Sequence, residues 1–514
     1  MTTRSTCHRC HLCSINGERG GTWTRRTEDE KKKKKRRKGL VFRRSLRNGN
    51  VERCPEKSED ASFADASSTT SSRREVLRAA LVCTGAAGTA FFDLFGGMTA
   101  RAELGPESNW PLWLALPIAP YGRKKTIKRQ VGPGIWIFDQ SIAIYYVTVP
   151  IRMTVVAMEG GGLFVYAPIA PTKECLHLLQ PLIDAFGKVK YIVLPSVAVE
   201  HKVNAGPFAR KFPDAEFYVT DKQYSFPINL PSSFLGFPPW TKPLPTSSRD
   251  MTTSSSSSQA KTVPWDGEFE HEVLRVKPGV GSDYQDAAFY HKPSKTVLVC
   301  DALYSTTEDP PAILTSDPEY VRALLFHARD SPEEVPLDTP ENRRKGWRRI
   351  IMYANYFIPG AATADLGPGP ILTALKQLDY PLGWGGWLPF QWRDAGTELR
   401  AFKQFSAEGK PQMLPIIQII LARGPEALEE WLNRIKSWDF NKVIPAHLDA
   451  PLEMGPTEFA ATFEQAFGEG KNKVRSCDED VEFLRKAEEG PLKFSVYASP
   501  LGTLRGASGC NLRA

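Results

Sequence analysis

The chain has few cysteines after its first hundred residues. Of the nine in the sequence, only Cys175, Cys300, Cys477 and Cys510 lie beyond residue 102. They are scattered singly, so they predict neither a disulfide framework nor a zinc site of spaced cysteines. The Cys-x-x-Cys-His pattern that begins at Cys7 matches a covalent haem site, but it lies in a segment that we expect to be removed. We assign it no function.

Long hydrophobic runs are also missing after Glu103. The most apolar stretch there is "SIAIYYVTVPIRMTVVAM", residues 141–158. Pro150 and Arg152 interrupt it, and it is rich in Val, Ile, Tyr and Thr, which favours two strands of a sheet over a helix in lipid. The sequence therefore predicts no membrane-spanning helix beyond residue 102.

An excess of positive charge is absent from the same region. Residues 1–102 carry 22 Lys and Arg against 11 Asp and Glu, whereas residues 103–514 carry 44 against 47. The basic character of the chain, with its pI of about 8.9, belongs to its first hundred residues. It does not indicate a nucleic-acid partner, although a basic pI often does.

The first hundred residues have the pattern of a targeting leader. Residues 1–72 are polar, basic and rich in Ser and Thr, as in a transit-like segment without a core. Residues 73–102 begin with Arg73-Arg74, continue with the apolar run Ala79–Phe92 and end on "ARA", which resembles a twin-arginine export signal. Together they predict a chloroplast protein of the thylakoid lumen. The alternative is an ordinary membrane-anchoring helix.

The rest of the chain alternates between strand and helix signals. Short β-branched and aromatic runs in residues 134–171 predict antiparallel strands, and an amphipathic helix follows at residues 171–188. A buried strand "YIVLP", a short helix at "GPFARKFP" and a strand "EFYVT" come next. We therefore expect an α/β core at 103–312 with a Ser-rich surface loop at 244–264, a helical insertion at 313–440, the end of the core at 441–470 and a charged, loosely held tail at 471–514.

Three strands end on residues that can bind a metal ion. "YIVLP" leads to Glu200 and His201, "TVLVCD" ends on Asp301, and "KVIPAH" ends on His447. Strand ends in layered α/β folds are where sites assemble, because loops converge there over a rigid base. Glu200 and His201 are adjacent, so both can face one ion only if the chain has already left the strand.

The order of these motifs resembles the metallo-β-lactamase fold, a four-layered αββα sandwich with metals over its strand ends. "SVAVEH", residues 196–201, fills the frame H-x-H-x-D-H of that family. The resemblance implies that the first metal site is lost, because Ser196 and Ala198 replace histidines and "PGVGSD" near Gly279 offers none. It implies that the second site remains in altered form, as Glu200, His201, Asp301 and His447.

A closer resemblance is to a plant, algal and bacterial family called domain of unknown function 4336, regarded as a distant relative of that fold. The strings "VPIRMTVV", "YIVLPSVAVEHK", "AFYHKPSKTVLVCDAL" and "GWRRI" carry it. It implies an α/β (α+β) sandwich with a helical insertion. This resemblance does not indicate which reaction, if any, the protein catalyses.

Two functions follow as hypotheses. Two carboxylates and two imidazoles suit one Zn, Mn or Fe ion, which would activate water against an ester, thioester or phosphoester. The alternative is a non-catalytic scaffold or assembly factor of the photosynthetic membrane, with a thylakoid membrane protein as partner and "YPLGWGGWLPFQW", residues 380–392, as its contact surface. In a third interpretation the four residues are a relic, with Glu200 and Lys202 in an ordinary ion pair. Ser196 is not predicted to be a nucleophile, since no His-Asp pair can be placed beside it.

Overall fold

The computed structural model describes residues 124–144, 147–223, 231–249, 263–279, 282–365, 388, 390–464 and 478–493. All of these belong to one compact unit of the chain. Residues 1–102, predicted to be a targeting leader, residues 250–262 of the Ser-rich loop and most of residues 380–392 lie outside the described residues. In the described part of the chain, no helix is both long and apolar enough to cross a bilayer.

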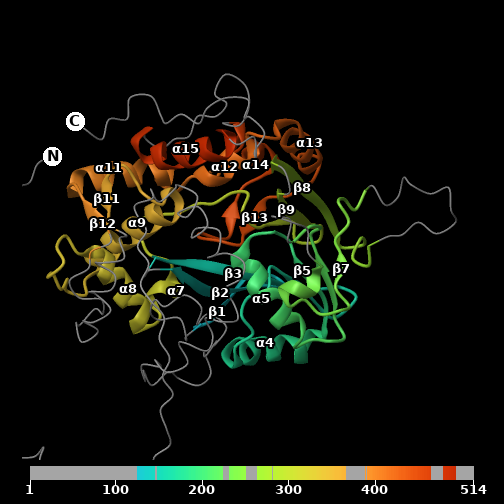
Figure 1. Ribbon diagram of the computed structural model, residues 1–514. Coiled ribbons are helices and arrows are strands. Elements are labelled where there is room, and N and C mark those ends of the chain that lie inside the picture. Colours follow the sequence, from blue (N-terminus) through green and yellow to red (C-terminus); the bar gives the residue numbers. More distant parts are fainter. Residues whose placement is uncertain are drawn as a thin grey trace, which may run out of the picture. The chain divides into compact units, whose positions relative to one another are not determined.

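Two sheets form the centre of the fold (Figure 1). The first has the order β1-β2-β3-β4-β5-β6-β7 and the second the order β14-β13-β10-β9-β8. The strands of the first are β1 (Ile127–Gly132), β2 (Ile135–Ile144), β3 (Val147–Ala157), β4 (Leu163–Tyr166), β5 (Val189–Leu194), β6 (Glu216–Val219) and β7 (Lys242–Pro243). Those of the second are β8 (Phe269–Gly279), β9 (Ser282–His291), β10 (Thr296–Val299), β13 (Lys442–Pro445) and β14 (Leu452–Glu453).

The first sheet changes from antiparallel to parallel halfway across. Strands β1 to β4 form the predicted antiparallel meander, and the apolar stretch around Arg152 is indeed two strands, β2 and β3. Strands β4, β5, β6 and β7 are parallel. Helix α4 (Lys173–Phe186) makes the crossover from β4 to β5. Thr172 caps it by accepting the Cys175 N–H, and it ends at Gly187, whose φ of 99° suits glycine.

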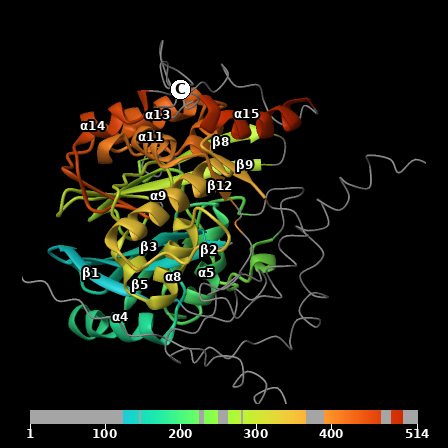
Figure 2. The same ribbon diagram turned by 90° about the vertical axis from the view of Figure 1, so that its left-hand side faces the viewer.

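Four layers stack through three apolar interfaces (Figure 2). Helices α4 and α5 (Val199–Ala209) cover the outer face of the first sheet. Between the sheets lies an aromatic core, in which Phe164 stacks on Phe269 with ring centroids 4.3 Å apart and Trp265 packs edge-on at 5.6 Å. Helices α12 (Pro415–Leu421), α13 (Pro425–Ile435) and α14 (Pro456–Ala461) cover the second sheet. The predicted αββα sandwich is therefore confirmed.

The predicted helical region, 313–440, has two different parts. Helices α12 and α13 are the outer layer of the second sheet, as the contact from Trp431 Nε1 to the Glu272 carbonyl on β8 shows. The remaining helices of this region form a separate apolar cluster beside the start of β3, at Val147. They are α7 (Ala312–Thr315), α8 (Pro318–Ala328), α9 (Pro340–Tyr356) and α11 (Ala395–Ser406), with the small hairpin β11 (Ala362–Ala364) and β12 (Phe390–Trp392). The described residues also form two short 3-10 turns, Ser232–Leu235 and Ala407–Gly409.

Part of the charged C-terminal segment is helical. Helix α15 (Asp478–Lys493) packs on α9, with Val481 and Leu484 in the apolar cluster. Asp480 accepts a hydrogen bond from the Gly360 N–H at 2.7 Å. The expectation of a loosely held tail is therefore wrong for this helix, because its spacing of apolar residues provides a face to bury.

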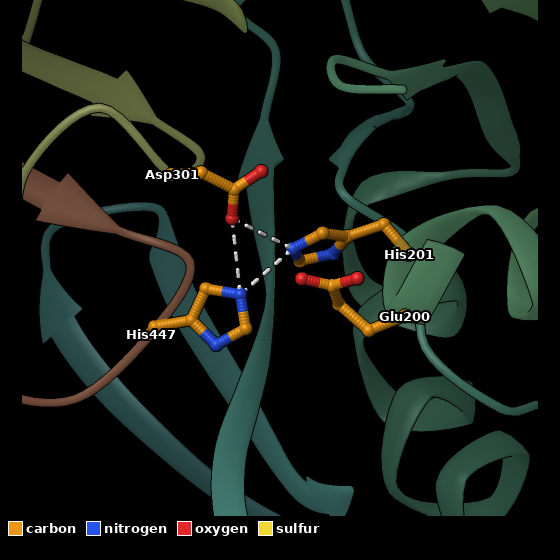
Figure 3. Close-up of side chains that lie close together, drawn as sticks. All are labelled: Glu200, His201, Asp301 and His447. Atoms are coloured by element: carbon orange, nitrogen blue, oxygen red, sulfur yellow. Dashed lines mark hydrogen bonds and ion pairs between the residues drawn. The ribbon is translucent and has the colours of Figure 1, made fainter. Parts of the chain in front are cut away.

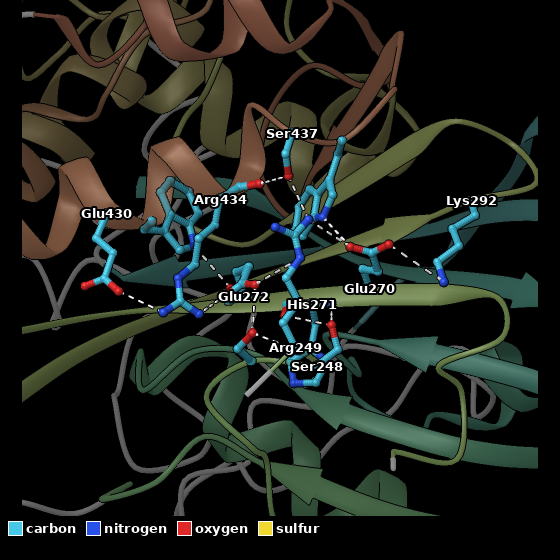
Figure 4. A network of polar contacts seen from close by, with 12 residues as sticks. Ser248, Arg249, Glu270, His271, Glu272, Lys292, Glu430, Arg434 and Ser437 are labelled. Atoms are coloured by element: carbon cyan, nitrogen blue, oxygen red, sulfur yellow. Dashed lines mark hydrogen bonds and ion pairs between the residues drawn. The ribbon is translucent and has the colours of Figure 1, made fainter. Parts of the chain in front are cut away.

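The start of the Ser-rich loop is held in a polar network over β8 (Figure 4). Ser247 donates to the buried Glu272 at 2.7 Å, and Arg249 pairs with Glu270 at 3.1 Å. Arg434 on α13 binds the other oxygen of Glu272 at 3.3 Å. This network ties the loop, β8 and α13 together, so residues 244–249 are not the free surface loop that their composition predicts.

Candidate metal centre

Three strand ends bring the four candidate ligands together (Figure 3). Helix α5 after β5 supplies Glu200 and His201, and Asp301 and His447 follow β10 and β13. Strands β10 and β13 are parallel neighbours, so their ends lie at the same edge of the second sheet. One ligand atom from each of the four side chains lies within 4.8 Å of the others.

Helix α5 allows two adjacent residues to face one point. The sequence predicts a short helix from about Gly206, but α5 begins at Val199, so that prediction is wrong by two turns. Glu200 and His201 therefore lie in the first helical turn and not in a strand, where they would face opposite ways. His201 is fully buried, and Glu200 is half-buried.

The distances suit a common ion. His201 Nε2 lies 3.0 Å from His447 Nε2 and 3.5 Å from Asp301 Oδ1, and His447 Nε2 lies 3.1 Å from the same oxygen. Ligands 2.0–2.2 Å from one ion, at octahedral to tetrahedral angles, are separated by about 2.8–3.6 Å. Figure 3 shows the Glu200 carboxylate turned toward these three groups. The donor set and its spacing thus fit a divalent ion.

His447 has its ring nitrogens assigned by its surroundings. Nδ1 lies 2.8 Å from the Pro150 carbonyl oxygen, which can only accept, so Nδ1 carries the proton. The neutral ring then presents the lone pair of Nε2 to the cluster, as a metal-ligating histidine with a backbone partner does. His201 differs, because its buried Nδ1 has no partner among the described residues.

Asp301 is the charged centre of the cluster. Burial favours its neutral form, but hydrogen bonds and charge from His201 and His447 outweigh burial and hold its pKa well below the usual value. His447 shows the same balance: burial opposes its protonation, but hydrogen bonding and charge from Asp301 outweigh burial and raise its pKa. The pocket is therefore built to hold positive charge beside Asp301.

Two residues that support the site were not predicted from the sequence. Asp286 on β9 is fully buried and accepts the Asp301 N–H at 2.6 Å and the Cys300 N–H at 3.2 Å. Burial and the charge of Asp301 raise the pKa of Asp286 to about 7. Arg152 on β3 donates to carbonyl groups around His447. The sequence could have indicated both residues, because a charged side chain within an apolar strand is rarely buried without a partner.

The positions of the missing first site have other roles. Ser196 donates a hydrogen bond to Asp301 Oδ2 at 2.7 Å, and Ala198 precedes α5 as its N-cap. In the "PGVGSD" segment, Pro278 and Gly279 end β8 and Ser282 and Asp283 begin β9, and residues 280 and 281 lie outside the described residues. Within the described ranges, the four-residue cluster is the one group of this kind.

The ion pair between Glu200 and Lys202, expected if the four residues were a relic, is not formed. Lys202 donates to the Gln223 carbonyl and not to Glu200. Burial lowers the pKa of Lys202 to about 8, against the charge of Glu200. Asp301 and His447 point their side chains at each other, and His447 Nδ1 also donates to the Pro150 carbonyl.

Comparison with known proteins gives the family. Residues 133–465 match the family described as "Domain of unknown function (DUF4336)", and the chain belongs to it. A search of curated proteins finds no match.

Solved structures with a similar fold include metallo-β-lactamases. The DIM-1 enzyme exposed to ceftazidime is 10% identical over 67% of this chain and 98% of its own, with a TM-score of 0.31. FIM-1 from Pseudomonas aeruginosa, in a mono-zinc form, is 10% identical over 44% and 95%, with a TM-score of 0.26. A putative diflavin flavoprotein fragment from Nostoc sp. PCC 7120 is 9% identical over 71% and 99%, with a TM-score of 0.32. The fold of this chain is defined by its own two sheets and four layers.

Proposed function

We propose that this protein is a single-metal hydrolase that cleaves an ester or a related bond. The observation that carries the proposal is the meeting of Glu200, His201, Asp301 and His447 with ligand atoms within 4.8 Å. Two carboxylates balance the charge of a divalent ion, and two imidazoles complete a donor set that suits Zn, Mn or Fe. A buried divalent charge needs this compensation.

The ion would supply the chemistry, and the chain would supply its placement. A bound divalent ion lowers the pKa of a water molecule that it holds to about 7. The Pro150 carbonyl fixes the proton of His447 on Nδ1, so Nε2 is free to bind without tautomer change. His201 and Asp301 are buried, whereas Glu200 and His447 are half-buried, so a substrate would approach from the side of these two residues.

Metal content of the full-length protein tests the proposal. We expect about one equivalent of a divalent ion, lost in His201→Ala and retained in His177→Ala, a control that changes an exposed histidine on α4. The loaded protein should hydrolyse at least one of an aryl ester, a thioester and a phosphodiester, and the chelated protein none. A wild-type protein that retains no ion would contradict the proposal and favour the scaffold alternative.

We further propose that the protein acts in the chloroplast, in the thylakoid lumen. The transit-like composition of residues 1–72 and the Arg73-Arg74 signal support this location. A fluorescent protein fused after residue 102 should enter the lumen, and replacement of both arginines by lysine should leave it in the stroma. Lumenal delivery of the lysine variant would contradict the twin-arginine assignment.

A further inference from the structure

Ser196 lies at the base of the metal centre, and its hydroxyl direction is fixed. Its side chain is fully buried, and Oγ accepts the Ala198 N–H at 3.0 Å. Its backbone pairs with Asp286 on β9 and accepts from Gln223 Nε2 at 3.1 Å. With the backbone held on both sides and Oγ already accepting one hydrogen, the hydroxyl proton points to its remaining neighbour, which is Asp301.

The two carboxylate oxygens of Asp301 therefore have different partners. Oδ2 accepts from Ser196 Oγ at 2.7 Å, and Oδ1 faces His447 Nε2 at 3.1 Å and His201 Nε2 at 3.5 Å. Asp286 holds the Asp301 peptide through its N–H at 2.6 Å. Asp286 thus fixes the backbone of Asp301, and Ser196 fixes the rotation of its carboxylate.

We propose that Ser196 is a positioning residue that presents Oδ1 of Asp301 to the ion. The inference rests on the proposed single-ion site. The terminal torsion of an aspartate is broad and roughly two-fold, so an unheld carboxylate samples many orientations. A hydroxyl that holds one oxygen removes this freedom before the ion binds. Hydrogen bonds to metal ligands typically change metal affinity 10–100-fold.

This role makes Ser196 more than a lost ligand. Its hydroxyl is directed at the far oxygen of Asp301 and not at the point between the two histidines. Ser196 occupies a histidine position of the frame H-x-H-x-D-H. In this chain it orients one of the remaining candidate ligands, Asp301.

Ser196→Ala in the full-length protein tests the inference. We expect about tenfold weaker Zn²⁺ binding by competition with a chromophoric chelator, with the stoichiometry still near one. The visible absorption of the Co²⁺-loaded protein should also change, because Asp301 is no longer held in one orientation. Ser196→Thr keeps the hydroxyl and should restore both the affinity and the spectrum.

Ser247 provides a matched control in the same protein. It is also buried, donates to a carboxylate oxygen at 2.7 Å (Glu272 Oε1) and accepts an N–H two residues on at 3.0 Å (Arg249). Ser247→Ala should lower the melting temperature to a similar extent without changing Zn²⁺ affinity or the Co²⁺ spectrum. A merely structural role for Ser196 would make the two variants alike.

The possible failures can be told apart. If Ser196→Ala binds Zn²⁺ as tightly as the wild type, with an unchanged Co²⁺ spectrum, the positioning role is overturned while the metal site stands. If the wild type binds no ion, the proposed function itself is overturned. If Ser196→Ala does not fold, Ser196→Thr decides alone: wild-type affinity supports the role, and a tenfold loss in a folded protein overturns it.

Discussion

The guanidinium of Arg152 binds the backbone on both sides of His447. Its Nη1 donates to the Pro445 carbonyl at 2.8 Å and its Nη2 to the Leu448 carbonyl at 2.7 Å. The backbone N–H of Arg152 donates to the Ala446 carbonyl. Arg152 belongs to the first sheet and His447 to a loop of the second. The same arginine forms a buried ion pair with Asp139 at 2.7 Å. One side chain thus fixes the loop that carries His447, a candidate metal ligand, to the opposite sheet.

Arg152→Lys should therefore weaken both the fold and the metal site. Lysine keeps the charge but cannot bind several carbonyl groups in the arginine geometry. We expect a loss of about 2–3 kcal/mol in the free energy of unfolding, since charge-assisted hydrogen bonds are removed in the interior. Zn²⁺ affinity should fall at least tenfold, measured by chelator competition.

Arg349→Lys is the control for this variant. Arg349 is equally buried and pairs with Glu398 at 2.8 Å, away from the metal centre. It should lose comparable stability and keep wild-type Zn²⁺ affinity. Equal losses of affinity in both variants would show that Arg152 acts only through general stability.

Glu200→Asp should weaken metal binding although it restores the residue usual in the metal frame. Helix α5 fixes the backbone of residue 200, and an aspartate reaches less far by roughly 1.3–1.5 Å. With ligand distances held near 2.0–2.2 Å, the shorter side chain cannot reach the ion without movement of the helix. We expect a several-fold higher dissociation constant, with Glu319→Asp in the first turn of α8 as a neutral control. Tighter binding in Glu200→Asp would show that α5 moves toward the ion.

Asp480 should make stability depend on pH. Burial raises its pKa to about 7 from the usual 3.8, so the folded protein keeps a proton that the unfolded chain releases. Its contribution to stability is fully present below pH 3.8 and is lost as the pH rises toward 7. Asp480→Asn should therefore unfold like the wild type near pH 4 and be more stable at pH 8, by on the order of 4 kcal/mol.

Denaturant unfolding at intervals between pH 4 and pH 8 measures this difference. Asp184→Asn, at an exposed position on α4, should give a difference from the wild type that does not change with pH. A constant difference for Asp480→Asn as well would contradict the assignment.

Gly346 should not tolerate a side chain. A Cβ at this position would lie 1.9 Å from the Leu324 carbonyl oxygen, because α8 and α9 pack closely there. The contact is with backbone and cannot be relieved by a rotamer change, so Gly346→Ala should cost about 3 kcal/mol of unfolding free energy. Gly160→Ala, where a Cβ meets no atom within 4 Å, should leave the melting temperature nearly unchanged.

The sequence predicts the layers and the site because both leave local patterns. The β-branched runs of β2, β3 and β5 and the polar residues after β10 and β13 are visible without any knowledge of the fold. The start of α5 is not, because its N-cap, Ala198, makes no side-chain cap and Pro207 lies inside the helix. An apolar helix face likewise does not reveal which sheet it packs on. Helix α13 is predicted as part of an insertion, but it packs on β8 of the second sheet.

The support of the site is harder still to predict, since it depends on contacts between distant residues. Arg152 and the Leu448 carbonyl are 296 positions apart, and Ser196 and Asp301 are 105 apart. Nothing in the sequence around a serine between a strand and a helix indicates that its partner is a distant carboxylate. Only the folded backbone brings the two together.

The wide separation of the ligands along the chain has a consequence for biosynthesis. His201 and His447 are 246 positions apart, and each depends on a different sheet for its orientation. While the ribosome is still making the region before residue 447, no intermediate can have the complete donor set. The proposed ion would therefore bind late, after both sheets have docked, and would stabilise the folded protein without starting its folding.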